Sequence, residues 1–282
     1  MDTVPRITVV TLALATCLAS AAIAETKKEY RFMVGAKANV SVETQYGAIS
    51  VRPGSSSLVI VTATLQSDKA EVDTQKRGNR IDIASHLLAG ADPQTGRIDY
   101  ELLIPADATL NLHSSTGPLS AERLQGDLTL EGTDAVVDVH NVSNGHVHVR
   151  TMRGPVTLTD VRNGHVEISS ISGDVTLKSV TGTLVQADSG SGKIFYDGDF
   201  GSGGDYKFTT HTGDITAIVP ADASADFSAH SMTGKVQKDF PLEPRHNRFS
   251  FEEGHSFFGT VGKAASKVVL HSFSGRIHLK LR

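Results

Sequence analysis

The chain has 282 residues, and 27 Lys and Arg against 31 Asp and Glu give it a formal net charge of −4. Charged residues make up 21% of the chain, too few for a disordered tail and too evenly balanced for a nucleic-acid-binding protein, so no nucleic-acid partner is expected. The single cysteine, Cys17, excludes an intrachain disulfide and a cysteine-based zinc site.

Residues 1–24 are predicted to be a Sec signal peptide. Arg6 precedes a short apolar run, residues 7–19, and Ala22-Ile23-Ala24 supplies a small-residue cleavage site before Glu25. The run is too short for a comfortable membrane span, and no other segment approaches ~20 apolar residues, so no transmembrane span is expected. The mature chain is therefore expected to be exported, to the periplasm or to the outer cell surface.

A lipoprotein is the alternative interpretation of this segment, because Leu14-Ala15-Thr16-Cys17 resembles a lipobox. Thr16 stands where such motifs normally carry Gly, Ala or Ser, which favours cleavage after Ala24 over lipid anchoring at Cys17. After cleavage at Ala24 the mature chain would contain no cysteine.

Residues 25–104 are expected to form an N-terminal β region that caps the segment after it. Apolar residues alternate with polar ones, which is the period of a β-strand. The alternating sets are Tyr30/Phe32/Val34, Val59/Val61/Ala63 and Ile98/Tyr100/Leu102/Ile104. A polar loop is predicted near residues 89–96.

One pattern recurs eight times from residue 40 onward: apolar-x-apolar-x-[Ser/Thr]-x-x-Gly-x-apolar. The eight hydroxyl residues are Thr44, Ser114, Thr151, Ser170, Ser189, Thr210, Ser231 and Ser272, each three residues before its glycine. A hydroxyl in this place can bond the backbone of its own turn, whereas a serine nucleophile needs one exceptional Ser beside a His base. Eight equivalent hydroxyls are therefore predicted to be structural, and no catalytic residue is assigned.

The central part of the chain, residues 105–240, is expected to be the regular part of the repeat. Gly154, Gly173 and Gly192 are spaced by 19 residues. Aligning the sequence by 19 gives apolar columns such as Leu128/Val147/Val166/Val185 and Val137/Val156/Val175/Ile194. Strands this short bury a face only when copies stack at ~4.8 Å. The sequence therefore predicts an all-β fold: a parallel β-solenoid with two short strands per ~19-residue coil and less regular β caps.

Residues 241–282 are expected to form a loop or hairpin and then a closing repeat around Gly275. The repeat is broken over residues 241–267. Upstream, Ile104-Pro105-Ala106-Asp107-Ala108 is echoed by Val219-Pro220-Ala221-Asp222-Ala223, and each echo leads into another copy of the repeat. Proline is expected to end one strand there, and the Ala-Asp turn to begin the next.

One group of side chains is a candidate metal site. His146 and His148 alternate onto one strand face, and His165 and Glu167 stand 19 residues later, in the next coil. Imidazole and carboxylate suit Zn²⁺ or Ni²⁺. A flat face gives little preorganisation, so weak binding is expected, and a solvated polar face is the alternative.

Other chemistry is not predicted. Gly190-Ser191-Gly192-Lys193 is similar to a phosphate loop, but Ile194 replaces the required Ser or Thr, and no cofactor is expected. Outward Asp127, Asp138, Asp174 and Asp188 are scattered over different faces, so no paired-carboxylate site is evident. Glu131 and Arg150 share an outward column and are expected to form a surface ion pair of little energetic weight.

The motifs resemble those of the "putative adhesin" family of exported bacterial proteins (DUF4097-like), which is rich in S-G-D-[IV] repeats. The matching segments are Ser172-Gly173-Asp174-Val175, Thr212-Gly213-Asp214-Ile215 and Ser274-Gly275-Arg276-Ile277. The resemblance covers roughly residues 30–282. It implies a β-solenoid of the cell envelope and offers no catalytic residues.

The function expected on this basis is that of an exported, noncatalytic, adhesin-like or scaffold protein whose exposed ladders bind an envelope polymer or a protein partner. The first alternative is an envelope-stress sensing domain that recognises a ligand or partner with the same ladders. The second is an envelope-glycan-acting β-helix enzyme, which would need a groove with converging carboxylates. The oligomeric state stays open.

Overall fold

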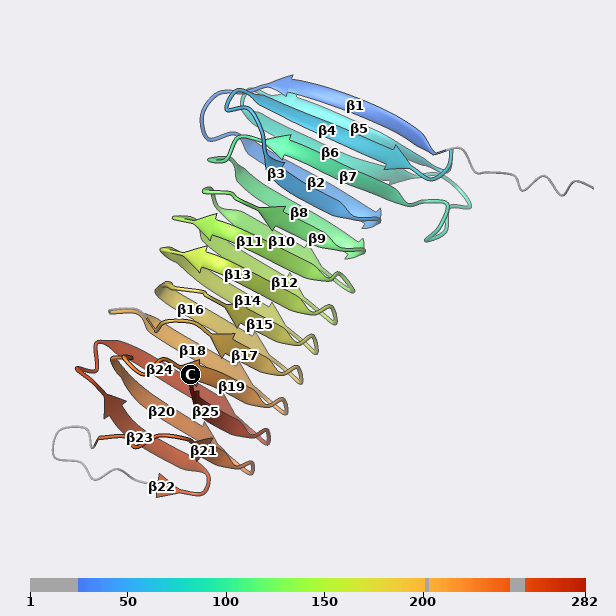
Figure 1. Ribbon diagram of the computed structural model, residues 1–282. Coiled ribbons are helices and arrows are strands. Elements are labelled where there is room, and N and C mark those ends of the chain that lie inside the picture. The colour runs from blue at the N-terminus through green and yellow to red at the C-terminus, as the bar shows by residue number, and fades with distance from the viewer. Residues whose placement is uncertain (1–24, 201–202, 244–251) are drawn as a thin grey trace, which may run out of the picture.

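The computed structural model describes residues 25–200, 203–243 and 252–282. The predicted signal peptide and Cys17 lie outside these residues. The described chain folds into two long β-sheets that face each other and run the length of an elongated stack (Figure 1). No helix long and apolar enough to cross a membrane occurs in the described residues.

Sheet A has 12 strands and sheet B has 13. In spatial order, sheet A consists of β1 (Thr26–Met33), β4 (Leu58–Leu65), β7 (Ile98–Ile104), β3 (Ile49–Pro53), β9 (Leu119–Glu122), β11 (Val137–Ser143), β13 (Val156–Arg162), β15 (Val175–Lys178), β17 (Ile194–Asp197), β19 (Ile215–Val219), β25 (Ile277–Leu281) and β21 (Val236–Lys238). Sheet B consists of β5 (Ala70–Arg77), β6 (Arg80–Leu87), β2 (Asn39–Tyr46), β8 (Thr109–Thr116), β10 (Leu128–Gly132), β12 (His146–Thr151), β14 (Gly164–Ser170), β16 (Gly182–Ser189), β18 (Asp205–Thr210), β24 (Ser266–Ser272), β20 (Ala225–Ser231), β23 (Ser256–Val261) and β22 (Glu252–Glu253).

The predicted register is confirmed in the central coils. Val137, Val156, Val175 and Ile194 are direct parallel partners in sheet A, and Leu128, Val147, Val166 and Val185 are partners in sheet B. Each coil contributes one strand to each sheet, and the inward residues of both sheets form one continuous apolar core. The fold is the predicted parallel solenoid with two strands per coil.

The core changes composition along the stack. Between β8 and β15 it consists of Val, Leu, Ile and Ala, whereas Tyr196, Phe200, Tyr206, Phe208 and Phe227 fill the part from β17 toward the C-terminal end. Their rings pack in edge-on and tilted pairs, with Tyr196 5.0 Å from both Phe200 and Phe208. The Tyr196 hydroxyl donates to the backbone oxygens of Val180 and Asp199, so the buried phenol is satisfied.

Antiparallel strands occur at both ends of the stack, in both sheets at the N-terminal end and in sheet B at the C-terminal end, where sheet A ends in the parallel strand β21. At the N-terminal end β1 pairs with β4, β4 with β7, and β5 with β6. At the C-terminal end β23 pairs with β20 and β22 with β23. These strands cover ladders that a bare coil would expose, and charged side chains on β1 and β5 protect the two N-terminal edges against further pairing.

Chain order and spatial order differ at both ends. The C-terminal repeat was expected to close the stack, and this prediction is wrong. Strand β24 lies between β18 and β20, and β25 lies between β19 and β21. Likewise β2 and β3 lie between the β6–β7 coil and the β8–β9 coil. The chain therefore skips one coil position at each end, and another segment fills it.

The two skips coincide with the two Pro-Ala-Asp echoes. After Ile104, the link that begins at Pro105 passes the β2–β3 coil, and after Val219 the link that begins at Pro220 passes the β24–β25 coil. Each link contains the same turn, in which the amide of the second Ala (Ala108 or Ala223) donates to the proline carbonyl at 3.1 Å. The echoed sequence thus marks a crossover that skips a coil.

Candidate functional site

All eight repeat hydroxyls lie buried at the turns that lead from sheet B to sheet A. Ser170, Ser189 and Ser272 each accept a hydrogen bond from the amide of the glycine three residues later, at 2.9 Å. Thr210 and Ser231 accept the same bond at 3.0 and 3.1 Å. These hydroxyls hold the backbone of their own turns.

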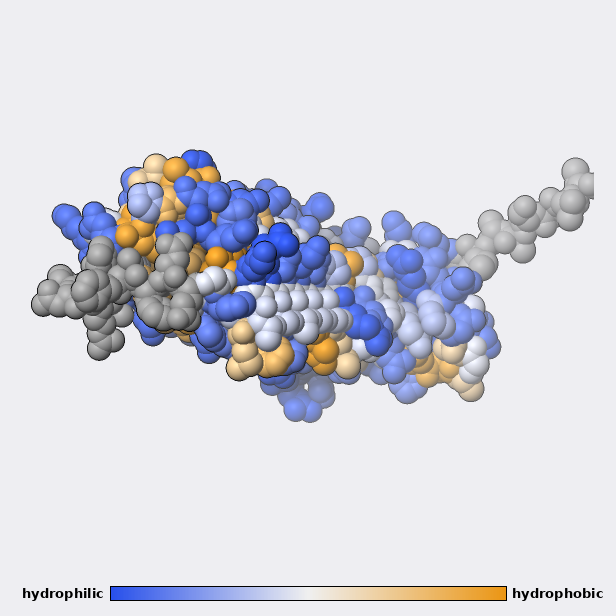
Figure 2. Space-filling model, turned by 90° about the horizontal axis from the view of Figure 1, so that it is seen from below, coloured by the Kyte–Doolittle hydropathy of each residue, from blue (hydrophilic) through white to orange (hydrophobic). Residues whose placement is uncertain are grey.

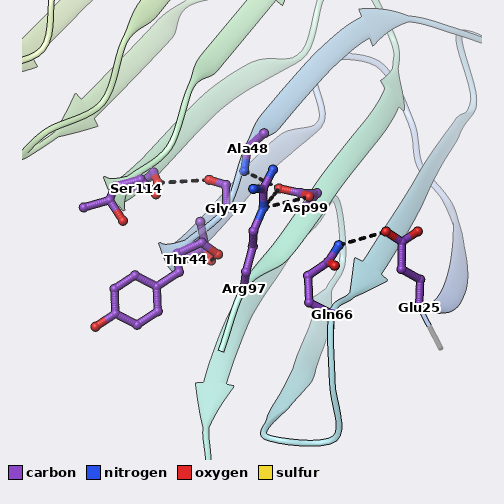
Figure 3. A network of polar contacts seen from close by, with 10 residues as sticks. Glu25, Thr44, Gly47, Ala48, Gln66, Arg97, Asp99 and Ser114 are labelled. Carbon is purple, nitrogen blue, oxygen red and sulfur yellow. Dashed lines mark hydrogen bonds and ion pairs between the residues drawn. The ribbon is translucent and has the colours of Figure 1, made fainter. Parts of the chain in front are cut away.

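The hydroxyls also connect neighbouring coils. Ser231 donates to the backbone oxygen of Gly275 at 2.8 Å, and Ser114 donates to that of Gly47 at 3.2 Å (Figure 3). Thr44 donates to Tyr46 within its own turn, and Thr151 contacts Gly154 and Ser170. Because these bonds occupy the hydroxyls with backbone groups, the column serves the turns, and nothing in its geometry singles out one nucleophile.

Aspartates provide a second link between coils. Figure 3 shows the carboxylate of Asp99 accepting the amide of Ala48, at 2.7 Å, and Nε of Arg97, at 3.0 Å. Asp174 accepts the amide of Lys193, and Asp214 accepts the amide of Arg276. In each case a carboxylate of one coil satisfies the first amide of the neighbouring coil, where the ladder would otherwise be interrupted.

The four predicted metal-site residues lie where the sequence placed them, on the outer face of sheet B. They form two separate pairs. The rings of His146 and His165 stack at 4.6 Å, and Nδ1 of His148 lies 3.5 Å from a carboxylate oxygen of Glu167. Lone pairs of stacked imidazoles lie in nearly parallel planes and do not converge on one ion. Among the residues that the structure describes, no group of three or more His, Cys, Asp or Glu side chains could hold a metal.

The same outer face carries two long columns of mostly polar side chains, the first of which includes His148 and Glu167. The first column is Ser41, Asn111, Thr129, His148, Glu167, Gln186, Lys207, Val269 and Ser228; the second is Glu43, His113, Glu131, Arg150, Ser169, Asp188, Thr209, His271 and His230. Arg150 lies 3.7 Å from Glu131, which confirms the predicted exposed ion pair.

Two shallow hollows mark the N-terminal half of this face. One, of about 360 Å³, is lined by Ser41, Glu43, Asn111, His113, Thr129 and Glu131. The other, of about 450 Å³, shares Ser41 and Glu43 with it and extends to the side chains of β5 and β6. Sequence reasoning missed this region because 70 residues separate Gly47 from Gly117, so the 19-residue alignment does not bring Glu43 beside His113.

What this region can do chemically follows from its side chains. Amide, hydroxyl, imidazole and carboxylate groups alternate at the ~4.8 Å spacing of the coils. Such groups donate and accept hydrogen bonds to polar, repeating ligands, and charges of both signs are available. The hollows are open to solvent, so they suit a ligand that lies along the face rather than a small molecule enclosed by the protein.

A family model matches most of this chain. The model described as Toastrack DUF4097 aligns with residues 38–280. The chain belongs to the Toastrack DUF4097 family. The resemblance inferred from the repeat motifs is thereby confirmed. A search of curated proteins finds no match to the chain.

Solved structures of similar proteins come from several bacteria. A "putative adhesin" from Bacteroides fragilis is 10% identical, with 91% of this chain and 98% of that chain covered and a TM-score of 0.51. A "putative cell adhesion protein" from Clostridium sporogenes is 12% identical, with 91% and 100% covered and a TM-score of 0.25. A "putative adhesin" from Parabacteroides distasonis is 10% identical, with 91% and 97% covered and a TM-score of 0.37. At these identities the Bacteroides fragilis structure supports a shared Toastrack fold and nothing finer.

Proposed function

We propose that this Toastrack protein is an exported, noncatalytic binding scaffold of the bacterial envelope, and that the outer face of sheet B binds a linear envelope polymer. The predicted signal peptide and the adhesin descriptions of the structural neighbours support an exported or surface location. The alternative partner, a protein, would use the same face. Envelope-stress sensing differs from this proposal only in what the bound partner triggers.

The repeated polar columns of sheet B carry the proposal. A linear polysaccharide presents hydroxyl groups at regular intervals, and the outer face presents one hydrogen-bonding position per coil in each column. Ser41, Asn111 and Thr129 occupy three successive coils in one hollow, flanked by Glu43, His113 and Glu131 in the next column. A rigid array of this kind binds without first ordering its own side-chain platform, which lowers the entropic cost of binding.

A glycan hydrolase is a second candidate, and one observation favours it. Glu43 and Glu131 lie in one column two coils apart, so their Cα atoms are ~9.6 Å apart, and small side-chain rotations can bring the two carboxyl groups closer than that. Inverting glycosidases hold their two carboxyl groups about 6.5–9.5 Å apart. Against this role, both side chains lie on an open face whose hollow is shallow, whereas a hydrolase encloses the scissile bond between its two acids.

Co-sedimentation of the mature chain, residues 25–282, with purified peptidoglycan sacculi tests the binding proposal. The double variant Asn111→Ala/Thr129→Ala is expected to reduce the bound fraction several-fold. The matched control is Thr157→Ala/Thr176→Ala, two outward positions in adjacent coils of sheet A, and it should bind as the unaltered chain does. Equal binding by both variants, or no sedimentation of the unaltered chain with sacculi, would contradict the proposal.

Two further measurements separate the alternatives. Release of soluble sugar by the unaltered chain, lost in Glu131→Gln, would replace the scaffold with a hydrolase. The mass of the protein recovered from cells tests export, because processing after Ala24 gives a chain beginning at Glu25. A diacylglyceryl group on Cys17 would instead make it a lipoprotein.

A further inference from the structure

The edge formed by the Ser-x-x-Gly turns is organised into three columns over six successive coils. In spatial order the first column is Met152, Ile171, Gly190, His211, Phe273 and Met232. The second is Arg153, Ser172, Ser191, Thr212, Ser274 and Thr233. The third is Pro155, Asp174, Lys193, Asp214, Arg276 and Lys235. Backbone hydrogen bonds between the first two columns fix this order: Ser172 donates to Met152, Ser274 to His211, and Thr233 to Phe273.

These three columns over the six coils form the turn edge, and the turn edge is amphipathic across its width. Figure 2 shows a pale row of residues along the molecule, with strongly hydrophilic atoms on one side and hydrophobic atoms on the other. Ile171 is 59% exposed and Met232 57% exposed, and Met152 and Phe273 are exposed as well. The Phe273 ring stacks on the ring of His211 at 4.7 Å. The exposed apolar side chains form two pairs, Met152 with Ile171 and Phe273 with Met232, separated by Gly190 and His211, and exposed apolar clusters of this kind are typical of an interaction surface.

Four successive members of the third column alternate in sign and form no ion pair with one another. Asp174, Lys193, Asp214 and Arg276 follow one another in four successive coils. Each aspartate uses one oxygen to accept a backbone amide, from Lys193 at 2.8 Å and from Arg276 at 2.7 Å. In the described part of the chain, the side chains of Lys193 and Arg276 take part in no ion pair. These four residues therefore offer two cations, Lys193 and Arg276, to another molecule.

The order of the columns is self-complementary under one particular rotation. Consider a two-fold axis in the contact plane, across the edge, between the coils of Gly192 and Gly213. This axis reverses the order of coils but leaves each column facing itself. Ile171 then faces Phe273 of a second copy, and Met152 faces Met232. Gly190, the smallest residue of the column, faces His211.

Four of the charges match under the same rotation, and Lys235 faces Pro155. Lys193 faces Asp214 of the second copy, and Asp174 faces Arg276. In the hydroxyl column Ser172 faces Ser274 and Ser191 faces Thr212. Rotation about the long axis of the stack would instead place the apolar column against the charged column at every coil. Only the antiparallel arrangement satisfies both columns.

We propose that two copies of this chain associate antiparallel through the turn edge, as an isologous dimer. Six coils give an edge only ~29 Å long at ~4.8 Å per coil, and a strip three residues wide buries less than the ~800 Å² per partner of a standard interface. The dimer is accordingly weak in dilute solution and forms where the protein is concentrated, as on a surface. It does not depend on which polymer or protein the outer face of sheet B binds.

Disulfide trapping tests the arrangement, because the mature chain has no cysteine of its own. Two single variants, Ser172→Cys and Ser274→Cys, are prepared with tags of different mass. Each variant is oxidised alone, and a mixture of the two is oxidised in parallel. The antiparallel dimer places position 172 of one copy against position 274 of the other. A disulfide needs Cα atoms about 4.4–6.8 Å apart, whereas two copies of position 172 would lie about three coils apart, or ~14 Å. Only the mixture is expected to give covalent dimer.

Two controls keep the result interpretable. Ser143→Cys mixed with Thr181→Cys places thiols on the opposite edge of the stack and should give several-fold less covalent dimer. Adding Ile171→Asp to the Ser172→Cys chain should reduce trapping several-fold, while Thr176→Asp, on the outer face of sheet A, should not. Trapping of Ser172→Cys alone at the yield of the mixture would overturn the proposal, and so would a mixture no more productive than the opposite-edge control.

Discussion

The central coils and the two ends of this solenoid obey different rules of order. From β8 to β19 each coil lies directly beside the one that precedes it in the chain. At the ends the chain skips a position, and the gap is filled by the earlier β2–β3 coil or by the later β24–β25 coil. The repeat motif is the same in both regions, so the motif determines the shape of a coil, and the link between coils determines where that coil lies.

This difference has consequences for stability. A central coil pairs on both sides with its neighbours in the sequence. The β24–β25 coil instead lies between two coils that both precede it in the chain. Strands β20 and β21 pair with β24 and β25, so the C-terminal end depends on the inserted coil. Because solenoid stability is a sum of nearest-neighbour terms, damage at the two places should spread differently.

The largest expected effect comes from a charge in the central core. Val175 is 1% exposed, with Val156 and Ile194 as its partners. Val175→Asp buries an unpaired carboxylate and should cost about 4 kcal/mol or more, which unfolds the central coils. Thr176→Asp, one residue on and facing outward, should change the free energy of unfolding by about 0.5 kcal/mol or less. Equal shifts in the thermal midpoint would show that the inward and outward phases are wrongly assigned.

A substitution in the inserted coil should act locally. A Cβ added at Gly275 would lie 1.7 Å from the backbone oxygen of Gly213, so Gly275→Ala forces the two coils apart, at a cost of about 3 kcal/mol. Hydrogen exchange should increase in β24, β25, β20 and β21 and stay slow in β8 to β15. Gly254→Ala is the matched control, because a Cβ there meets nothing within 4 Å. Uniform exchange along the whole stack would contradict the nearest-neighbour account.

Alkaline pH should sharpen the contrast between aliphatic and aromatic core. Burial raises the pKa of Tyr206 to about 12 and raises that of Tyr196 as well. An unfolded tyrosine titrates near 10, so the stability from Tyr206 is fully present below pH ~10 and is lost as the pH rises toward 12, at about 1.4 kcal/mol per unit. The free energy of unfolding, measured by denaturant titration between pH 9 and 12, should therefore fall less steeply with pH in Tyr206→Phe than in the unaltered chain. An unchanged slope in that variant would contradict the assignment.

The sequence was sufficient to predict the coil and its register, because identical residue types recur at a fixed spacing in Val137, Val156 and Val175. It could not predict the order of coils at the ends, since adjacent coils present the same apolar columns and any two of them can pair. The Pro-Ala-Asp echo was visible, but its meaning depends on a partner 40 or more residues away in the chain.

The surface columns were predicted less completely than the core. His146 and His165 were placed correctly because they lie in the 19-residue section, whereas Glu43 and His113 were not aligned.

The edge of the stack opposite the Ser-x-x-Gly turns was not predicted from residue types either. Arg123, Asn141, Asp160 and Ser179 all adopt a positive φ in one column, yet only Asn and Asp are typical of that conformation. There the stacking of backbones, rather than the residue type, imposes the geometry.

The smallest expected effect concerns the feature that the central coils and the ends share, the buried hydroxyl column. Ser189 in a central coil and Ser231 in an end coil accept the same glycine amide, at 2.9 and 3.1 Å. Replacing either with Ala leaves a buried amide without its partner and should cost about 1–2 kcal/mol. Ser191→Ala, on the exposed column two residues from Ser189, should cost close to nothing.

Chemical denaturation at dilute concentration, below dimer formation, measures these differences. If the column is structural, Ser189→Ala and Ser231→Ala lose stability by similar amounts, and binding to sacculi is retained under conditions where both remain folded. One serine whose replacement left stability intact but abolished an activity would instead identify a nucleophile. The shared cost is expected because each hydroxyl bonds its own turn, a contact that is the same whether the coil above it comes next in the chain or was inserted from elsewhere.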